Sequence, residues 1–265
     1  MGKDLNGIID LNRYPILSLN EVNGRGTLQD CHSQLEKNSL CLLPQFVTKR
    51  FISEVLTEIR EHNNKAFYRE HWRSAFGASR SISGLQSAKT RASMHSIAFD
   101  IFPETSKLRS LYESEPFTKF LRKVLKKDKF FKCADQMVGC IVTICRENDE
   151  LGWHYDPNDG VVTLMLQKSE VGGKFEFAPN SHPNEEIINE HEQAIVAGSR
   201  YNTHLVDQDA GTLSIFNGSK ALHRVTPVGK GEERIMAIFS YSDTPGYVFR
   251  DDVRQNFFGR KKAII

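Results

Sequence analysis

The pattern of apolar and polar positions divides the chain into a helical first part and a strand-rich second part. Two stretches before residue 130 carry apolar residues at helical spacing, at about 48–62 and about 106–127. Thr48 is a suitable N-cap for the first helix, whose apolar stripe faces a core. Pro116 is expected to interrupt the second, because proline removes a helical hydrogen bond.

The remaining N-terminal segments show weaker patterns. Residues 1–40 are poorly patterned, and 41–43 read as a short buried strand. Residues 63–95 are rich in Ser, Gly and Arg and are predicted to be a long irregular stretch. Long loops of this kind are often lids or binding loops.

After residue 135, short segments rich in Val, Ile, Phe and Thr alternate with Gly, Asn, Asp or Pro and read as strands. They are 137–145, 161–166, 174–177, 212–216, 222–228 and 235–241. One helix is expected among them, from Asn184 as N-cap to Gly198 as stop signal. Because strands and helices do not alternate, a parallel α/β fold is disfavoured. The pattern favours a mainly β fold, a sandwich or jelly roll backed by N-terminal helices.

Composition narrows the class of protein. A chain of 265 residues fits one large β-rich domain or two small ones, and a net charge of +2 lacks the basic footprint of a nucleic-acid-binding protein. The basic run at 119–132 reads as the wet face of a helix. No apolar run approaches a membrane span and no signal peptide is evident. Five cysteines without a C-x-x-C fit a reducing cytoplasm.

The candidate chemistry lies in His154, Asp156 and His223. His154 and Asp156 are two residues apart, so on an extended segment their side chains leave the same face. His223 lies on a different predicted strand, which a sandwich can bring close. Two imidazoles and one carboxylate are the facial ligand set of non-haem Fe(II) oxygenases. An H-x-D alone is a weak signal, since a surface histidine is commoner; the downstream His and Arg strengthen it.

Arg234 follows His223 across a predicted hairpin with its turn at 229–232. In that hairpin Arg234 would lie near Thr226, roughly 13 Å from His223 at about 3.3 Å per residue. A guanidinium there could hold the far carboxylate of a dicarboxylate cosubstrate that chelates the iron. Thr226 and Arg224 are further candidate contacts of this cosubstrate, Arg224 being the next anchor if Arg234 is not.

From about residue 130 onward, several motifs resemble one bacterial group of Fe(II)/2-oxoglutarate-dependent enzymes. The group contains free-amino-acid halogenases, such as the lysine halogenases, and their hydroxylase relatives. The matching segments are DELGWHYD at 149–156, NDGVVTL at 158–164, GGKFEFAP at 172–179, GTL at 211–213, LHRVTPV at 222–228 and FFGR at 257–260. DLNRYP at 10–15 and LPQF at 43–46 agree more loosely.

The resemblance implies a double-stranded β-helix (jelly roll) core and the use of Fe(II), O2 and 2-oxoglutarate. His154, Asp156 and His223 would be the metal ligands, and Arg234 would bind 2-oxoglutarate. It also implies a single domain, with a helical part at about 1–130, the core at about 131–245 and a tail at 246–265.

The carboxylate of the H-x-D motif decides the type of reaction that the resemblance implies. Halogenating members replace this carboxylate by Gly, whereas Asp156 is retained here, so the resemblance points to hydroxylation. The expected reaction hydroxylates an unactivated C–H of a free polar amino acid, basic ones included, with release of succinate and CO2. No membrane or nucleic-acid partner is expected.

Substrate contacts are expected from two segments and several charges. The stretch around His71 and Arg73, and the aromatic pair Phe257 and Phe258, would close over the substrate. The pair occupies the place where lysine-specific members use Trp. An amino acid also needs groups for its charged ends. Arg73 or Arg224 would take the carboxylate, and the candidates for ammonium are Asp135, Asp159 and Glu176, although each is more often a solvated surface charge.

Two alternatives remain. The first is a protein or peptide hydroxylase of the same fold. The second is a non-catalytic jelly-roll binding module with a vestigial site, which the retention of all four key residues disfavours. Succinate release with and without candidate amino acids separates them.

Overall fold

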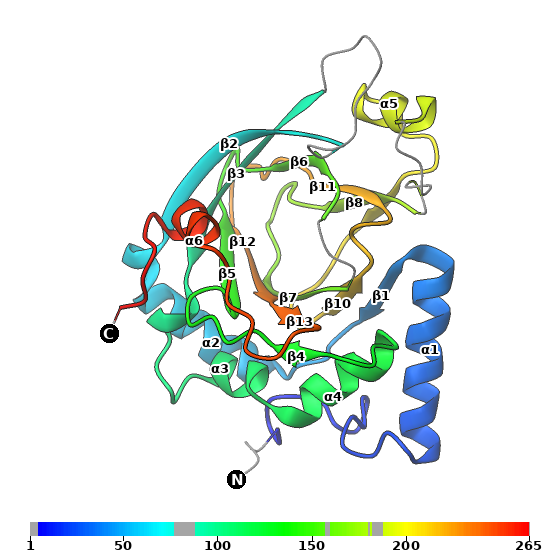
Figure 1. Cartoon of the computed structure of the whole chain (residues 1–265), viewed down its shortest axis with the longest axis vertical. Helices are drawn as coiled ribbons and strands as arrows, with labels where there is room; N and C mark the ends of the chain where they lie inside the picture. Colours follow the sequence, from blue (N-terminus) through cyan, green and yellow to red (C-terminus); the bar gives the residue numbers. More distant parts are fainter. Residues whose placement is uncertain (1–4, 77–87, 157–159, 180, 182–187, 265) are drawn as a thin grey trace.

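The computed structural model describes residues 5–76, 88–156, 160–179, 181 and 188–264. In these residues, antiparallel strands form an 11-stranded sheet that curls around an interior (Figure 1). Its strands are β1 (Leu40–Leu43), β2 (Phe67–Ser74), β3 (Lys89–Ile97), β5 (Cys140–Cys145), β6 (Leu151–His154), β7 (Val161–Gln167), β8 (Phe175–Ala178), β9 (His204–Val206), β10 (Leu213–Phe216), β11 (Leu222–Val225) and β12 (Arg234–Phe239).

The strand order is β1-β10-β7-β12-β5-β3-β6-β11-β8-β9, and β2 pairs with β3 beside this path. β4 (Phe131–Lys132) and β13 (Tyr241–Ser242) form a separate two-stranded sheet. In Figure 1, β6, β11 and β8 form one wall of the roll, and β7 and β10 lie across the interior from them. The mainly β jelly-roll prediction is confirmed.

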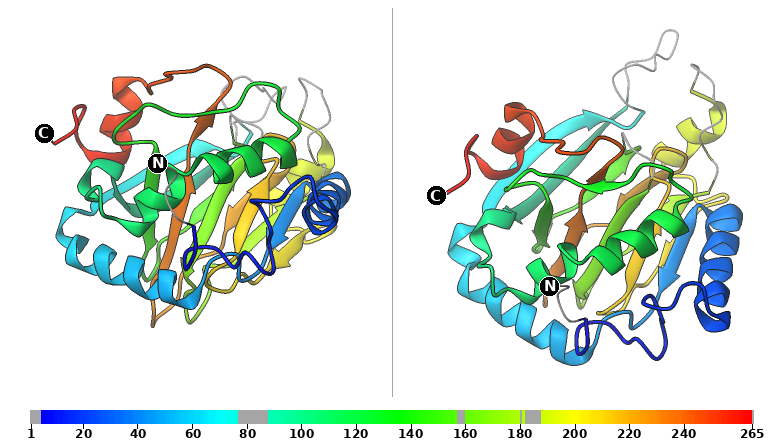
Figure 2. Two further views of the ribbon diagram at one scale, coloured as in Figure 1. Left: turned by 90° about the horizontal axis from the view of Figure 1, so that it is seen from below. Right: turned by 60° about the horizontal axis from the view of Figure 1, so that its bottom comes forward.

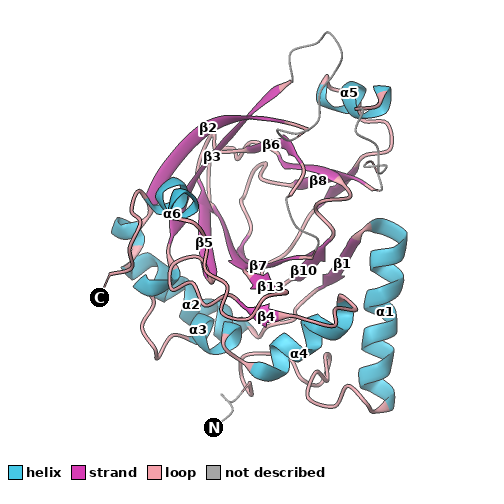
Figure 3. Cartoon of the chain, in the orientation of Figure 1, coloured by secondary structure: helices cyan, strands magenta, loops and turns pink. Residues whose placement is uncertain are grey.

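Helices lie on the outside of the roll (Figures 2 and 3). They are α1 (Val22–Asn38), α2 (Lys49–Glu61), α3 (Lys107–Tyr112), α4 (Glu115–Val124), α5 (Glu190–Val196) and α6 (Asp251–Phe258), with 3-10 turns at Asn63–Lys65 and Phe99–Ile101. The main apolar core lies between the N-terminal helices and the outer face of β5, β7, β10 and β12.

Strand β12 shows why the interior remains available for a site. Ile235, Ala237 and Phe239 belong to the core beneath the helices. Arg234, Met236 and Ile238 alternate with them and line a cavity inside the roll. Because successive strand residues leave opposite faces, one strand supplies both the packing and the site.

Two helix predictions need correction at the N-terminal side. Residues 22–38, part of the segment described as poorly patterned, form α1. Its Gly24 packs so closely on the preceding turn that a Cβ would lie 2.2 Å from the carbonyl oxygen of Ser18. The helix thus packs through a close contact at Gly24 rather than through an amphipathic face. Its polar sequence does not reveal such a contact. Pro116 lies in the first turn of α4 rather than interrupting a helix, because Ser114 caps a new helix there.

Helix α2 confirms its prediction, with the Thr48 hydroxyl accepting a hydrogen bond from Phe51 N at 3.1 Å. The helix expected at 184–198 is described as the shorter α5, which begins with a capping box on Asn189; 182–187 lie outside the described residues.

The prediction of an irregular stretch at 63–95 is wrong. β2 pairs antiparallel with β3 over the whole length of β2, from Phe67 with Ser96 to Ser74 with Lys89. β2 carries polar residues on both faces and pairs only with β3, so its sequence lacks the apolar alternation of a half-buried strand. Residues 77–87, between the two strands, lie outside the described part.

The expected hairpin between the strands of His223 and Arg234 is also wrong. β11 pairs with β6 and β8, whereas β12 pairs with β5 and β7. The sequence patterns did not predict strands β6 and β9 or helix α6. All five cysteines are free and buried, and none of the described helices is long and apolar enough to cross a membrane.

Candidate metal centre

His154 and His223 face each other across neighbouring strands. They are register partners in the β6–β11 pair, and their ring centroids lie 4.1 Å apart. Asp156 follows β6, with one carboxylate oxygen 3.0 Å from His223 Nε2 and the other 3.7 Å from His154 Nε2. One ligand atom from each residue falls within 4.8 Å of the others. This spacing fits a single metal ion held on one face.

Backbone carbonyls orient both imidazoles. Nδ1 of His154 lies 2.8 Å from Gly152 O, and Nδ1 of His223 lies 2.8 Å from Ala221 O. A proton on each Nδ1 donates to the carbonyl, which leaves the lone pair of Nε2 free to face the carboxylate. Metal-binding histidines are usually fixed by such a second hydrogen bond.

The protonation states suit a metal ligand set. Burial, with the nearby His223 and Arg73, holds the pKa of His154 well below its ordinary value. Burial opposes ionisation of Asp156, but the two histidines and Arg73 lower the pKa of its carboxyl below the usual range. A neutral imidazole and an ionised carboxylate are the forms that bind a metal.

Gly218 sets the position of Asp156. The sequence patterns did not identify this glycine. Its carbonyl accepts a hydrogen bond from Asp156 N at 3.1 Å. A Cβ at this position would lie 2.1 Å from Asp156 Oδ2. The only sequence signal is an Asn-Gly pair directly after β10.

Arg234 is deeply buried, with 3% of its surface exposed, and its Nε has no hydrogen-bond partner. One terminal nitrogen reaches only the sulfur of Met236, at 3.5 Å. Burial lowers the pKa of this guanidinium. No described carboxylate forms an ion pair with it. A buried cation without an anion is costly, so this arrangement indicates the place of an anionic ligand.

One cavity of about 120 Å³ joins the triad to Arg234. His154, Asp156 and His223 lie on its lining together with Arg234, although β11 and β12 are not adjacent. Apolar side chains make up most of the wall. Its other polar groups are Thr143, Thr163, Gln208 and Ser214. Thr143 and Thr163 stand as isolated hydroxyl residues within apolar strands, and this signal could have identified them.

The structure gives the other two cosubstrate candidates different partners. Arg224 donates to Glu176 at 2.7 Å and stacks on Trp153, on the opposite face of β11 from His223. The hydroxyl of Thr226 accepts a hydrogen bond from Lys174 N at 3.0 Å. Neither lines the cavity of Arg234, because the hairpin that would have placed them there is absent from the described strands.

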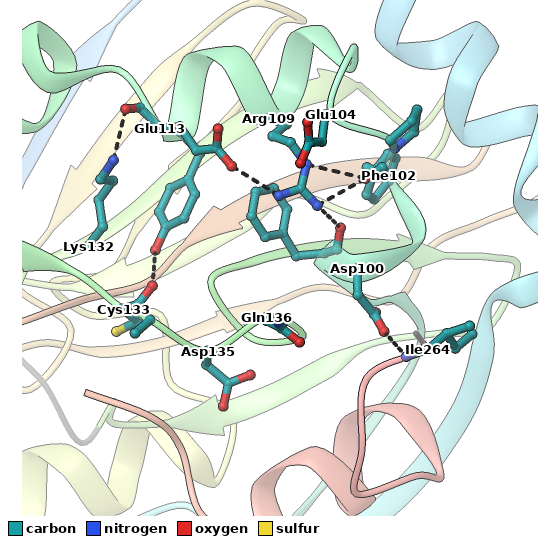
Figure 4. A pocket seen from close by; sticks show the side chains of 14 residues that line it. Asp100, Phe102, Glu104, Arg109, Glu113, Lys132, Cys133, Asp135, Gln136 and Ile264 are labelled. Carbon is teal, nitrogen blue, oxygen red and sulfur yellow. Dashed lines mark hydrogen bonds and ion pairs between the residues drawn. The ribbon is translucent and has the colours of Figure 1, made fainter. Parts of the chain in front are cut away.

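Two of the carboxylates expected to bind an ammonium group are also engaged. Glu176 pairs with Arg224, and Arg200 lies 3.3 Å away. Asp135 accepts hydrogen bonds from the backbone N of Met137, Val138 and Phe249, and lines a separate pocket of about 640 Å³ (Figure 4). Asp159 lies outside the described residues.

The predicted substrate segments come together at β2 and α6. His71 and Arg73 share one face of β2 with Arg69, whose guanidinium lies 3.9 Å from the ring centroid of Phe257. Phe258 instead packs in a small apolar cluster with Met137 and Ile141. Arg69 carried no expectation, because its strand was not predicted.

Comparisons with known proteins agree with this geometry. The sequence model of the Halogenase D family matches residues 24–248, and the chain belongs to this family. No curated protein sequence matches the chain.

Several solved structures share the fold. An oxidoreductase of the 2OG-Fe(II) oxygenase family from Burkholderia pseudomallei is 16% identical, with a TM-score of 0.52 over 83% of this chain and 92% of that one. HygX from Streptomyces hygroscopicus, solved with nickel, 2-oxoglutarate and hygromycin B, is 10% identical, with a TM-score of 0.56 over 82% and 88%. A Trichoplax adhaerens prolyl hydroxylase with a peptide fragment is 14% identical, with a TM-score of 0.52 over 82% and 90%.

The family and the fold together define the class: an enzyme of the Fe(II)/2-oxoglutarate-dependent oxygenase superfamily. Its cofactors are those of the superfamily, Fe(II), 2-oxoglutarate and O2. The prediction of this superfamily is therefore confirmed, while the choice of substrate is a separate question.

Proposed function

We propose that His154, Asp156 and His223 bind one Fe(II), and that Arg234 binds the far carboxylate of 2-oxoglutarate. The observation that carries this proposal is the buried guanidinium of Arg234, which has no described ion-pair partner and shares one cavity with the His/Asp/His triad. A dicarboxylate that chelates the metal at one end would neutralise Arg234 at the other. The apolar lining between them would exclude water.

We further propose that the enzyme hydroxylates an unactivated C–H of a free polar amino acid. When bound, iron and 2-oxoglutarate react with O2 to supply the oxidant, releasing succinate and CO2. Asp156 favours hydroxylation because it keeps a third protein ligand on the metal. The residues of the chain must hold the target carbon close to the metal and keep the site dry.

The proposed substrate-binding residues lie on one face of β2 and on α6. The charge of Arg73 helps to lower the pKa of both His154 and Asp156, so Arg73 lies near the triad. Arg73 is therefore the candidate for binding the amino-acid carboxylate. His71 and Phe257 would line the path away from the metal. Phe258, Asp135, Glu176 and Asp159 remain weaker proposals, since the first three have other partners.

The test combines metal binding with turnover. Purified protein loaded with Fe(II) under anaerobic conditions should bind one ion, and succinate release should rise with one of the common amino acids, giving a product heavier by one oxygen atom. His223→Ala should lose both metal and turnover.

His204→Ala is the matched control, because His204 is an exposed strand histidine outside the triad. Wild-type metal content in His223→Ala would refute the ligand assignment. Succinate formation that couples to a peptide and to no amino acid would replace the proposed function by peptide hydroxylation. No coupled turnover with any substrate would favour the binding module.

A further inference from the structure

The face of β2 that carries Arg69, His71 and Arg73 holds several nitrogens without partners, and the one described hydrogen bond of Arg69 goes to the sulfur of Met94, at 3.7 Å. Buried nitrogens lacking any hydrogen bond are present in all three: Nε of Arg69, Nδ1 of His71, and Nε with one terminal nitrogen of Arg73. Alternate positions of a strand point the same way, so the three side chains lie side by side. We call these three residues the β2 row.

The β2 row is cationic. Burial and the charge of Arg73 lower the pKa of Arg69 to about 10, and burial lowers the pKa of Arg73 to about 10, so both guanidiniums are charged at neutral pH. Burial and the two arginines lower the pKa of His71, which leaves its imidazole neutral. The row therefore offers two positive charges and one polar ring.

Apart from Arg234, the other partly buried arginines of the described structure have a carboxylate partner. Arg91, on the outer side of the same hairpin, lies 3.0 Å from Glu70, and Arg224 lies 2.7 Å from Glu176. In the pocket of Figure 4, Arg109 pairs with Glu113, and Lys132 donates to the carbonyl of Glu113. Arg69 and Arg73 have no described ion pair. Partly buried guanidiniums whose inaccessible nitrogens lack an anion indicate a ligand that supplies one.

The two ends of the row have different surroundings. Arg73 is at the metal end, where Asp156 is its charged neighbour. Arg69 is at the other end, beneath the ring of Phe257 on α6. The backbone distance between the two arginines is roughly 13 Å for four residues of a strand. Extended side chains converging from both ends could therefore hold the two acidic groups of one small molecule.

We propose that the substrate is an acidic amino acid, whose α-carboxylate binds at Arg73 and whose side-chain acidic group binds at Arg69 with His71 between them. This proposal rests on the proposed amino-acid hydroxylation and specifies its substrate class. Asp135 and Glu176, the described carboxylates expected to receive an ammonium group at the far end of a basic substrate, already have partners. The charge of the site therefore disfavours a basic side chain.

The direct test compares each acid with its uncharged amide in the Fe(II)-loaded enzyme. Succinate release is measured with glutamate and glutamine, with aspartate and asparagine, and with lysine. Saturating 2-oxoglutarate prevents glutamate from competing at Arg234. An acid should have a kcat/KM at least about fivefold above its amide, because hydrogen bonds to charged groups are stronger by roughly 1 kcal/mol. O-Phosphoserine distinguishes a phosphate from a carboxylate as the acidic group.

The residue assignment is tested with Arg69→Gln, which should bring the acid-to-amide ratio close to one, mainly through a higher KM for the acid. Arg91→Gln, on the outer side of the same hairpin, is the matched control and should keep the ratio. If Arg69→Gln does not fold, Arg69→Lys and the thermal stabilisation of the wild-type complex by glutamate relative to glutamine replace it.

The outcomes separate the two proposals. Turnover that is higher with an amide or with lysine would overturn the acidic substrate while leaving amino-acid hydroxylation intact. An unchanged ratio in a folded Arg69→Gln variant would overturn the role of the β2 row. Turnover with a peptide and with no amino acid would instead overturn the proposed function itself.

Discussion

Arg234 shows how one side chain can weaken the fold and serve the site. It lies at the start of β12 with 3% of its surface exposed and with no described acidic partner. The free protein therefore bears the cost of a desolvated charge, and a bound carboxylate would remove that cost.

Arg234→Met should stabilise the ligand-free protein and abolish 2-oxoglutarate binding. Even a buried ion pair replaced by apolar side chains of similar volume can gain about 1–4 kcal/mol, and an unpaired charge has no attraction to lose. Thermal unfolding with and without 2-oxoglutarate measures both effects: the variant should unfold at a higher temperature and show no shift with the ligand. Arg234→Lys is the control, which keeps the charge but not the planar fork. A variant less stable than wild type, or still stabilised by 2-oxoglutarate, would contradict this role.

Gly218→Ala should weaken metal binding without large loss of structure. The added Cβ would lie 2.1 Å from Asp156 Oδ2, so the carboxylate must turn away from the histidines. Loss of such a positioning contact costs about 10–100-fold in metal affinity, which titration with a divalent metal would measure. Gly26→Ala is the control, because a Cβ there meets nothing within 4 Å. Equal metal affinity in the two variants would disprove the positioning role.

At this scale the sequence predicts ligand residues better than the groups that support them. The H-x-D pattern and the downstream His and Arg carry a chemical signature that spacing reveals. Gly218 acts through the space it leaves empty, and Arg69 through the absence of a partner. Both properties exist only after the strands have paired, so no local pattern could indicate them.

At the scale of elements, β2 differs most from what the sequence predicted. Strands buried on one face were recognised by their apolar residues, as in β5, β7 and β12. β2 escaped recognition because one of its faces carries arginines and a histidine where other strands carry apolar residues. A strand with polar residues on both faces resembles a loop in sequence.

Substrate should slow hydrogen exchange in β2 and α6. These elements contact each other, and Phe257 of α6 lies over Arg69 of β2. A substrate bound along the β2 row would fix both, since local opening would have to break its contacts. Exchange is followed by mass spectrometry in the metal and 2-oxoglutarate complex, with glutamate added. The α2 segment is the internal reference, and unchanged exchange in both β2 and α6 would place the substrate elsewhere.

At the scale of the whole molecule, buried neutral histidines should make the metal-free protein sensitive to acid. The pKa values of His71, His95 and His154 are lowered, with burial as the largest cause in each. The unfolded chain then binds more protons below about pH 6.5, so the free energy of unfolding falls as the pH decreases through that range.

Urea unfolding in the presence of a chelator measures this dependence. The midpoint should be lower at pH 5.5 than at pH 7.5, and His71→Gln should reduce the difference. His204→Gln, at an exposed strand position, should leave it unchanged. Equal midpoints at the two pH values in the wild type would show that these histidines do not control acid stability.

The strand order has a consequence for how the enzyme is made. The metal ligands meet only when β11 pairs with β6, and Arg234 enters its cavity only when β12 inserts between β5 and β7. β12 is translated after both of the strands that it lies between. If Arg234 binds 2-oxoglutarate as proposed, a growing chain that has already made β5 and β7 still lacks this group until β12 joins them. The proposed cosubstrate site would therefore be completed only when the roll closes.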